Sequence, residues 1–107
     1  MNYPNHFKYG GTFTSDLVTV ATVSTNSTGL MIKTLTVCNG TSSINYLTVK
    51  LAGTAIMDNY ECPRNNGVSN VLQEGYHFVP SGATIQVQAS TSSTSLSYYM
   101  SGINVTS

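Results

Sequence analysis

The chain has 107 residues, a length that corresponds to a single domain. Only 7% of the residues are charged and the formal net charge is zero, which excludes the basic surface of a nucleic-acid-binding protein. Hydroxyl and amide groups replace the missing charges, because the chain contains 14 Ser, 15 Thr and 10 Asn. We therefore expect a folded domain with a polar, almost uncharged surface and without a nucleic-acid or membrane partner.

The N-terminal residues 1–11 differ in character from the rest of the chain. They contain three aromatic residues, Tyr3, Phe7 and Tyr9, and they end in a Gly-Gly pair. This composition predicts an extended N-terminal arm, joined by a flexible turn to a domain that spans residues 12–107. Two interpretations remain open: a frayed terminus, or an arm whose aromatic side chains bind a neighbouring subunit.

No apolar segment in the N-terminal region is typical of a signal peptide, and no apolar run reaches the length of a membrane span. We therefore expect synthesis in the cytoplasm. The glycosylation sequons at Asn26, Asn39 and Asn104 are then chance matches in a chain rich in Asn, Ser and Thr.

Short segments rich in β-branched and aromatic residues follow one another, separated by turn residues. No segment has a helical period of hydrophobic residues. The predicted strands are residues 12–24, 30–38, 46–52, 55–60, 68–72, 76–79, 84–89 and 95–105. Seven or eight short strands of this kind predict an all-β domain, an antiparallel β-sandwich with either jelly-roll or immunoglobulin-like topology.

Alternation within the strands assigns their faces. The residues expected to point inward are Leu47, Val49, Leu51, Ile85, Val87 and Ala89, and the residues expected to share one face of the last strand are Leu96, Tyr98 and Met100. The residues expected to point outward are Thr48, Lys50, Gln86 and Gln88. In residues 30–38, strict alternation places Lys33 on the same face as Leu35 and Val37, and Ile32 on the opposite face.

Titratable residues are few and do not form a recognisable catalytic pattern. They include two histidines and four carboxylates: His6, His77, Asp16, Asp58, Glu61 and Glu74. Neither histidine is paired with a nucleophile at a known spacing, and a glycosidase would need two carboxylates that face one cleft. We predict no catalytic residues, no cofactor-binding residues and no enzymatic activity.

The two cysteines, Cys38 and Cys62, do not form a metal-binding motif, and no glycine-rich phosphate loop is present. We therefore predict no metal site and no cofactor. A disulfide between neighbouring strands is one alternative. Buried free thiols are the expectation for a protein made in the cytoplasm.

The remaining candidate for function is a surface. Seven Tyr and many Asn residues are compatible with binding a glycan by stacking and hydrogen bonding, although the chain lacks Trp. Tyr98 and Tyr99 are expected on opposite faces of one strand, so they cannot both be exposed on the same side. The alternative is that the aromatic residues belong to the core and to an interface.

The order of several segments is distinctive. LTVCNGTSS at residues 35–43 is followed by LTVKL at residues 47–51, and VPSGATIQVQA at residues 79–89 precedes YYMSG at residues 98–102. This order resembles small β-sandwich structural proteins of tailed-bacteriophage virions, over about residues 30–105.

The resemblance implies a capsid decoration (cement) protein that forms a homotrimer, binds the major capsid protein, and stabilises the phage head by bridging capsid subunits. It would be found on the capsid surface of the virion, with residues 1–11 as its arm. A tail, fibre or adaptor component is the alternative within the same group. A carbohydrate-binding module is the alternative outside it.

Overall fold

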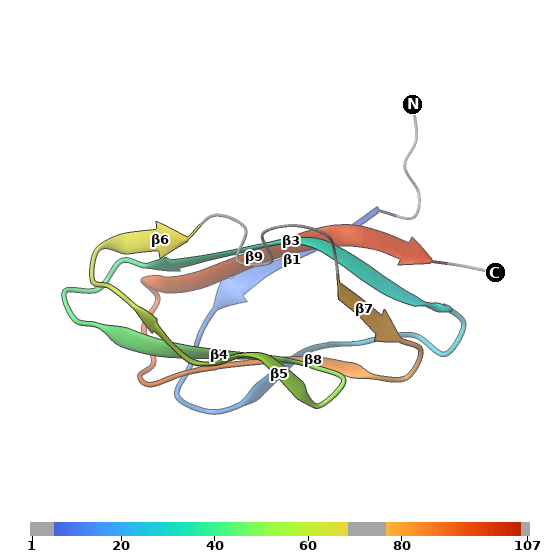
Figure 1. Ribbon diagram of the computed structural model, residues 1–107, viewed down its shortest axis with the longest axis horizontal. Coiled ribbons are helices and arrows are strands. Elements are labelled where there is room, and N and C mark those ends of the chain that lie inside the picture. Colours follow the sequence, from blue (N-terminus) through green and yellow to red (C-terminus); the bar gives the residue numbers. More distant parts are fainter. Residues whose placement is uncertain (1–5, 69–76, 106–107) are drawn as a thin grey trace.

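The computed structural model describes residues 6–68 and 77–105, which form nine strands in two layers (Figure 1). The strands are β1 (His6–Thr12), β2 (Val18–Thr22), β3 (Gly29–Asn39), β4 (Asn45–Leu51), β5 (Thr54–Cys62), β6 (Asn66–Val68), β7 (His77–Pro80), β8 (Thr84–Ala89) and β9 (Leu96–Val105). Among these residues, no helix has the length and apolar character needed to cross a membrane.

The strands form two antiparallel sheets that pack face to face as a sandwich. Sheet A has the order β1-β9-β3, with β6 and β7 both paired to the remaining edge of β3. Sheet B has the order β2-β8-β4-β5. The predicted all-β sandwich is confirmed. Because β6 and β7 lie along one edge like a single interrupted strand, each sheet is four strands wide.

Strand pairing is nested along the chain. β1 pairs with β9, β2 with β8, β3 with β6 and β7, and β4 with β5. A long two-stranded ribbon that is folded over on itself gives this pattern, which is the jelly-roll arrangement of eight strands. Of the two topologies that the sequence left open, the structure therefore has the jelly roll.

The core lies between the sheets and is built from aliphatic side chains of both layers, together with Phe13 and Met100, which are completely buried. Phe13 follows β1 and makes an edge-to-face contact with Tyr98, at 5.3 Å between ring centroids. The inward assignments of β4 and β8 are confirmed, since the predicted inward residues are buried. In β9 the residues predicted to share one face do so, and this face points to the core.

The prediction of an arm is wrong for residues 6–11, because they belong to β1 and pair with β9. Phe7 and Tyr9 lie on the inner face of sheet A and pack against the core, and this burial fixes the segment in the sheet. The Gly-Gly pair is no flexible turn, because both glycines lie within β1; a Cβ atom at Gly10 would lie 3.1 Å from the Tyr99 ring, and one at Gly11 would lie 3.0 Å from the Tyr98 hydroxyl. Residues 1–5 of the predicted arm lie outside the described residues.

Strict alternation in β3 is also corrected. The register between β3 and β9 shifts between Ile32 and Thr34, which indicates a β-bulge at Lys33. Ile32 is therefore buried on the same side as Leu35 and Val37, whereas Lys33 is exposed. The extra residue removes the energetic cost of a buried lysine while both apolar groups stay in the core.

The two strands predicted at residues 68–72 and 76–79 lie partly outside the described residues. Within them, Val68 ends β6 and residues 77–79 belong to β7.

The hairpin between β4 and β5 turns through Ala52 and Gly53, whose φ angles of +54° and +80° are both left-handed. Two positive φ angles define a type I′ turn, in which Asn-Gly is favoured because Asn tolerates this region better than Ala. We expect Ala52→Asn to stabilise the protein by about 0.5–1 kcal/mol. Thermal unfolding of the variant and the parent measures this difference, and an unchanged or lower Tm would contradict the turn assignment.

Candidate functional site

The outer face of sheet A carries a row of apolar side chains at one end. Phe78 of β7, Met31 of β3 and Ile103 of β9 are direct cross-strand partners, and we call these three residues the apolar row. Phe78 is 46% exposed and Ile103 is 37% exposed, while Met31 is half-buried between them. His6 of β1 continues the row to the sheet edge.

The Phe78 ring lies over Gly29 of β3, which has no side chain. A Cβ atom at Gly29 would lie 2.3 Å from the Phe78 ring, so the ring occupies the space that a side chain at this position of β3 would need. Val105 of β9, the partner of Gly29, is half-buried beside this position. The apolar row is thus a defined part of the sheet surface.

A second exposed aromatic residue, Tyr99, lies on the same outer face, farther along β9. It is directly opposite Gly10 of β1 and Thr36 of β3. Between Tyr99 and the apolar row, Thr34 and Ser101 share a hydrogen bond of 2.6 Å between their hydroxyl groups. The outer face of sheet A is therefore apolar and hydroxylated.

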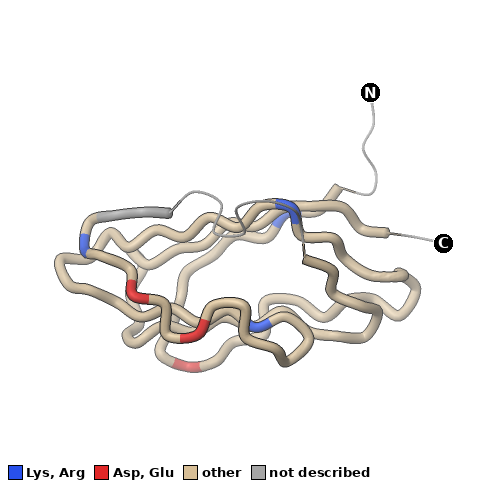
Figure 2. The backbone as a smooth tube through the Cα atoms, viewed as in Figure 1, with Lys and Arg blue, Asp and Glu red and all other residues tan. Residues whose placement is uncertain are grey.

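The described carboxylates lie outside sheet A. Lys8 and Lys33 are the charged side chains on the strands of sheet A, within the residues described. The described carboxylates lie elsewhere, with Asp58 and Glu61 on β5 of sheet B and Asp16 in the segment that precedes β2. Sheet B also carries Lys50 on β4, and Figure 2 shows the red segments and one blue segment in the lower part of the view.

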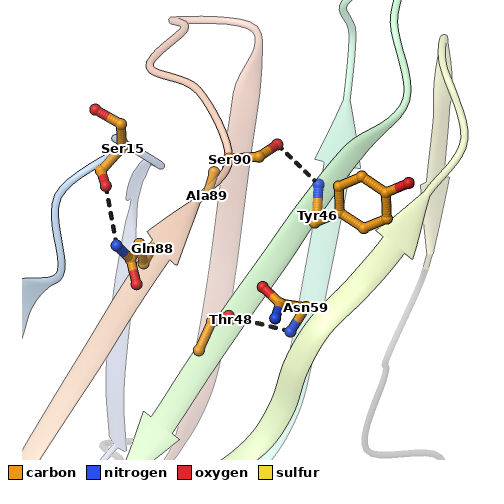
Figure 3. A pocket seen from close by; sticks show the side chains of 7 residues that line it. All are labelled: Ser15, Tyr46, Thr48, Asn59, Gln88, Ala89 and Ser90. Carbon is orange, nitrogen blue, oxygen red and sulfur yellow. Dashed lines mark hydrogen bonds between the residues drawn. The ribbon is translucent and has the colours of Figure 1, made fainter.

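A polar groove lies on the outer face of sheet B and has a cavity volume of about 290 Å³. Figure 3 shows the side chains that line it: Ser15, Tyr46, Thr48, Asn59, Gln88, Ala89 and Ser90. Thr48 of β4 is directly opposite Gln88 of β8, so the middle of the groove follows the pairing of these two strands. No lining residue is charged.

Hydrogen bonds fix several groove residues. The Gln88 amide donates to the Ser15 carbonyl oxygen at 2.9 Å, and the Asn59 backbone N–H donates to the Thr48 hydroxyl at 3.2 Å. The Ser90 hydroxyl accepts from the Tyr46 N–H at 3.1 Å. These contacts connect β8, β4, β5 and the segment before β2 (Figure 3).

A buried amide pair supports one end of the groove. Asn39, at the end of β3, is completely buried, and its amide donates to the carbonyl oxygens of Ser43 and Cys62 at 2.9 and 3.0 Å. Its oxygen accepts from the Thr41 backbone and hydroxyl. Asn45 accepts from Ser90 at 3.1 Å, so the network links sheet A to the wall of the groove.

The titratable residues considered in the sequence are dispersed. His6 and His77 are exposed on β1 and β7 of sheet A, whereas Asp58 and Glu61 are exposed on β5 of sheet B. Within residues 6–68 and 77–105, no three His, Cys, Asp or Glu side chains gather where they could hold a metal ion. Glu74 lies outside the described residues.

Both cysteines are free thiols, as the sequence led us to expect, but the expected burial is found for Cys62 and is wrong for Cys38. Cys38 is exposed on the outer face of sheet A, and Cys62 is buried at the end of β5. Burial raises the pKa of the Cys62 thiol, and the nearby Cys38 adds to this increase. A thiol with a raised pKa is a weak nucleophile at neutral pH.

A comparison of the chain with protein-family models, curated proteins and solved structures found no match. The likeness to virion proteins therefore rests on the sequence pattern.

The sequence predicted part of these surfaces. Alternation placed Thr48 and Gln88 on an outer face, and they line the groove. Alternation gave no signal for Asn59. This residue has a left-handed φ of +50° and lies in β5 where the register with β4 shifts. Alternation also gave no signal for the apolar row, because the alignment of β7, β3 and β9 depends on long-range pairing.

Proposed function

We propose that this chain is a structural protein of a phage virion, a capsid decoration protein that binds the major capsid protein through the outer face of sheet A. The observation that carries the proposal is the apolar row, in which Phe78 and Ile103 are 46% and 37% exposed to solvent. Exposed apolar side chains that lie together on one surface are typical of protein contact sites.

The fold and the charges support this choice. Jelly rolls form many viral capsid domains, although the fold alone does not determine function. Lys8 and Lys33 give this face a positive charge. A partner surface with apolar residues and carboxylates would match it, whereas a second copy bound face to face would bring lysines together.

The mechanism is mechanical. A subunit that binds two neighbouring capsid subunits at once stabilises the assembled lattice by mass action, because the paired site exists only in the lattice. The proposal includes a homotrimer, in which contacts between unlike faces close into a ring. Measuring the mass of the purified chain in solution tests the oligomeric state by itself.

The capsid proposal is tested by adding purified protein to capsids that lack it, from the virus that carries this sequence. The double variant Phe78→Thr, Ile103→Thr should bind at least about tenfold more weakly. Threonine has less apolar surface than phenylalanine or isoleucine, so less apolar surface is buried when the variant binds the capsid. Threonine is chosen because it favours β-strands, as phenylalanine and isoleucine do. A thermal melt verifies that the variant is folded.

Leu17→Ser is the matched control, because Leu17 is similarly exposed but precedes β2 of sheet B. It should bind like the parent chain. Equal occupancy of the double variant and the parent would overturn the assignment of the binding face. Labelling of intact particles at one vertex, instead of over the shell, would favour the tail component.

A further inference from the structure

We propose that the polar groove on sheet B binds a neutral carbohydrate. This site is separate from the apolar row, since the two lie on the outer faces of different sheets. It gives the protein an additional binding activity that does not depend on the capsid proposal.

The lining of the groove determines the charge of its ligand. Six of the seven lining residues carry a hydroxyl or an amide in their side chains, the phenol of Tyr46 included, and none carries a formal charge. An anionic or cationic ligand would leave its charge without a counter-ion in this site. A ligand rich in hydroxyl groups matches a lining of mixed donors and acceptors.

Two side-chain amides have hydrogen-bonding capacity left for a ligand. Gln88 uses one amide N–H in its bond to Ser15, which fixes the side chain and leaves its carbonyl oxygen available. The described contacts of Asn59 involve its backbone N–H, so its side-chain amide retains both donor and acceptor. The two amides lie on either side of Thr48 (Figure 3).

Such a pair suits the vicinal hydroxyl groups of a sugar, each of which can donate one hydrogen bond and accept another. Because Gln88 and the backbone of Asn59 are already held by protein contacts, a ligand would bind with a small loss of side-chain entropy.

Tyr46 supplies the apolar component. Its side chain is 42% exposed at the end of the groove, and its backbone is fixed on both sides by Ser90. An exposed tyrosine ring offers a flat apolar surface and a hydroxyl at its edge. A sugar ring has the complementary character, with C–H groups on one face and hydroxyl groups around its rim.

The size of the groove limits the ligand. A volume of about 290 Å³ is at the lower end of the roughly 300–1,000 Å³ of pockets that enclose drug-sized molecules. We therefore infer that one or two sugar units of a longer glycan occupy the groove. A peptide strand is a weaker candidate, because the middle of the groove lies over β4 and β8, which already pair with each other and leave no backbone groups there for strand addition.

The test uses the whole chain and a panel of neutral oligosaccharides of glucose, galactose, mannose and N-acetylglucosamine, with heparin fragments as charged probes. Binding is followed by NMR titration of the backbone amides. We expect at least one neutral probe to shift the signals of Thr48, Gln88 and Ser90, and the charged probes to have no effect there.

Variants then locate the site. Tyr46→Ala removes the ring and should raise the Kd by about fivefold to tenfold. Asn59→Gly removes the amide, tolerates the positive φ, and should raise the Kd by about threefold to tenfold. Gln86→Ala is the matched control, because Gln86 lies on the same face of β8 but does not line the groove.

The proposal is overturned if no neutral probe binds, if the shifts fall on sheet A, or if Tyr46→Ala and Gln86→Ala bind equally well. Failure of this test leaves capsid binding unaffected, since that assay depends on Phe78 and Ile103.

Discussion

Substitution of Gly102 by alanine is expected to destabilise the protein by about 3 kcal/mol or more. Gly102 is buried in β9 opposite Ile32, next to the bulge of β3. A Cβ atom there would lie 1.9 Å from the carbonyl oxygen of Met31 and 2.9 Å from the Phe7 ring. Since the closest atom belongs to the backbone, a side-chain rotation cannot relieve the clash. Either β9 must move away from β3 or the bulge must rearrange.

Urea-induced unfolding of the Gly102→Ala variant measures this effect. Gly10→Ala is the matched control in sheet A, because the nearest atom to its new Cβ, at 3.1 Å, belongs to the exposed side chain of Tyr99. That ring can shift, so we expect the control to change the free energy of unfolding by less than about 1 kcal/mol. Similar losses in both variants would show that the close approach of β9 and β3 is not the cause.

Removal of the Asn39 side chain is expected to have the second largest effect, a loss of about 2–4 kcal/mol in the free energy of unfolding. In the Asn39→Ala variant, the backbone N–H of Thr41 and the carbonyl oxygen of Cys62 lose hydrogen-bond partners at a buried site. The loop between β3 and β4 then loses its anchor to β5. Asn26→Ala, which truncates an exposed Asn in a turn, should change stability by less than about 0.5 kcal/mol.

Asn39→Asp tests the role of the amide donor at nearly constant shape. Its carboxylate would face the carbonyl oxygens that accept hydrogen bonds from Asn39, so the new group should have a raised pKa in the folded state. The folded state then binds a proton more tightly than the unfolded state. The stability of this variant should therefore fall as the pH rises from about 4 to about 7. A variant whose stability is the same at both values would argue against donation by the amide.

Much of the fold follows from local sequence pattern. Alternation correctly assigned β4, β8 and β9, because one face of each strand is packed against a core and the side-chain period is two. The same alternation is present in residues 6–9, where Phe7 and Tyr9 face the core and we expected an arm. The two glycines that follow were interpreted as a turn, whereas they make room for tyrosines of a strand about ninety residues away.

The irregular positions could not be predicted from local pattern. The bulge at Lys33 reverses the faces within β3, and it depends on the register with β9. The choice between jelly roll and immunoglobulin-like topology likewise depends on which strands pair across the chain. The candidate sites share this dependence, since the apolar row is assembled from β7, β3 and β9, and the groove from β8, β4 and β5.

The position of β9 has a consequence for how the chain becomes folded during synthesis. Of the nine strands described, β9 leaves the ribosome last, yet it lies between β1 and β3 and pairs with both. All strands of sheet B are available once residue 89 has emerged, but the other layer stays divided until β9 arrives. Nascent chains stalled before Leu96 should therefore leave the apolar residues of β1 and β3 exposed, as substrates for chaperones and proteases.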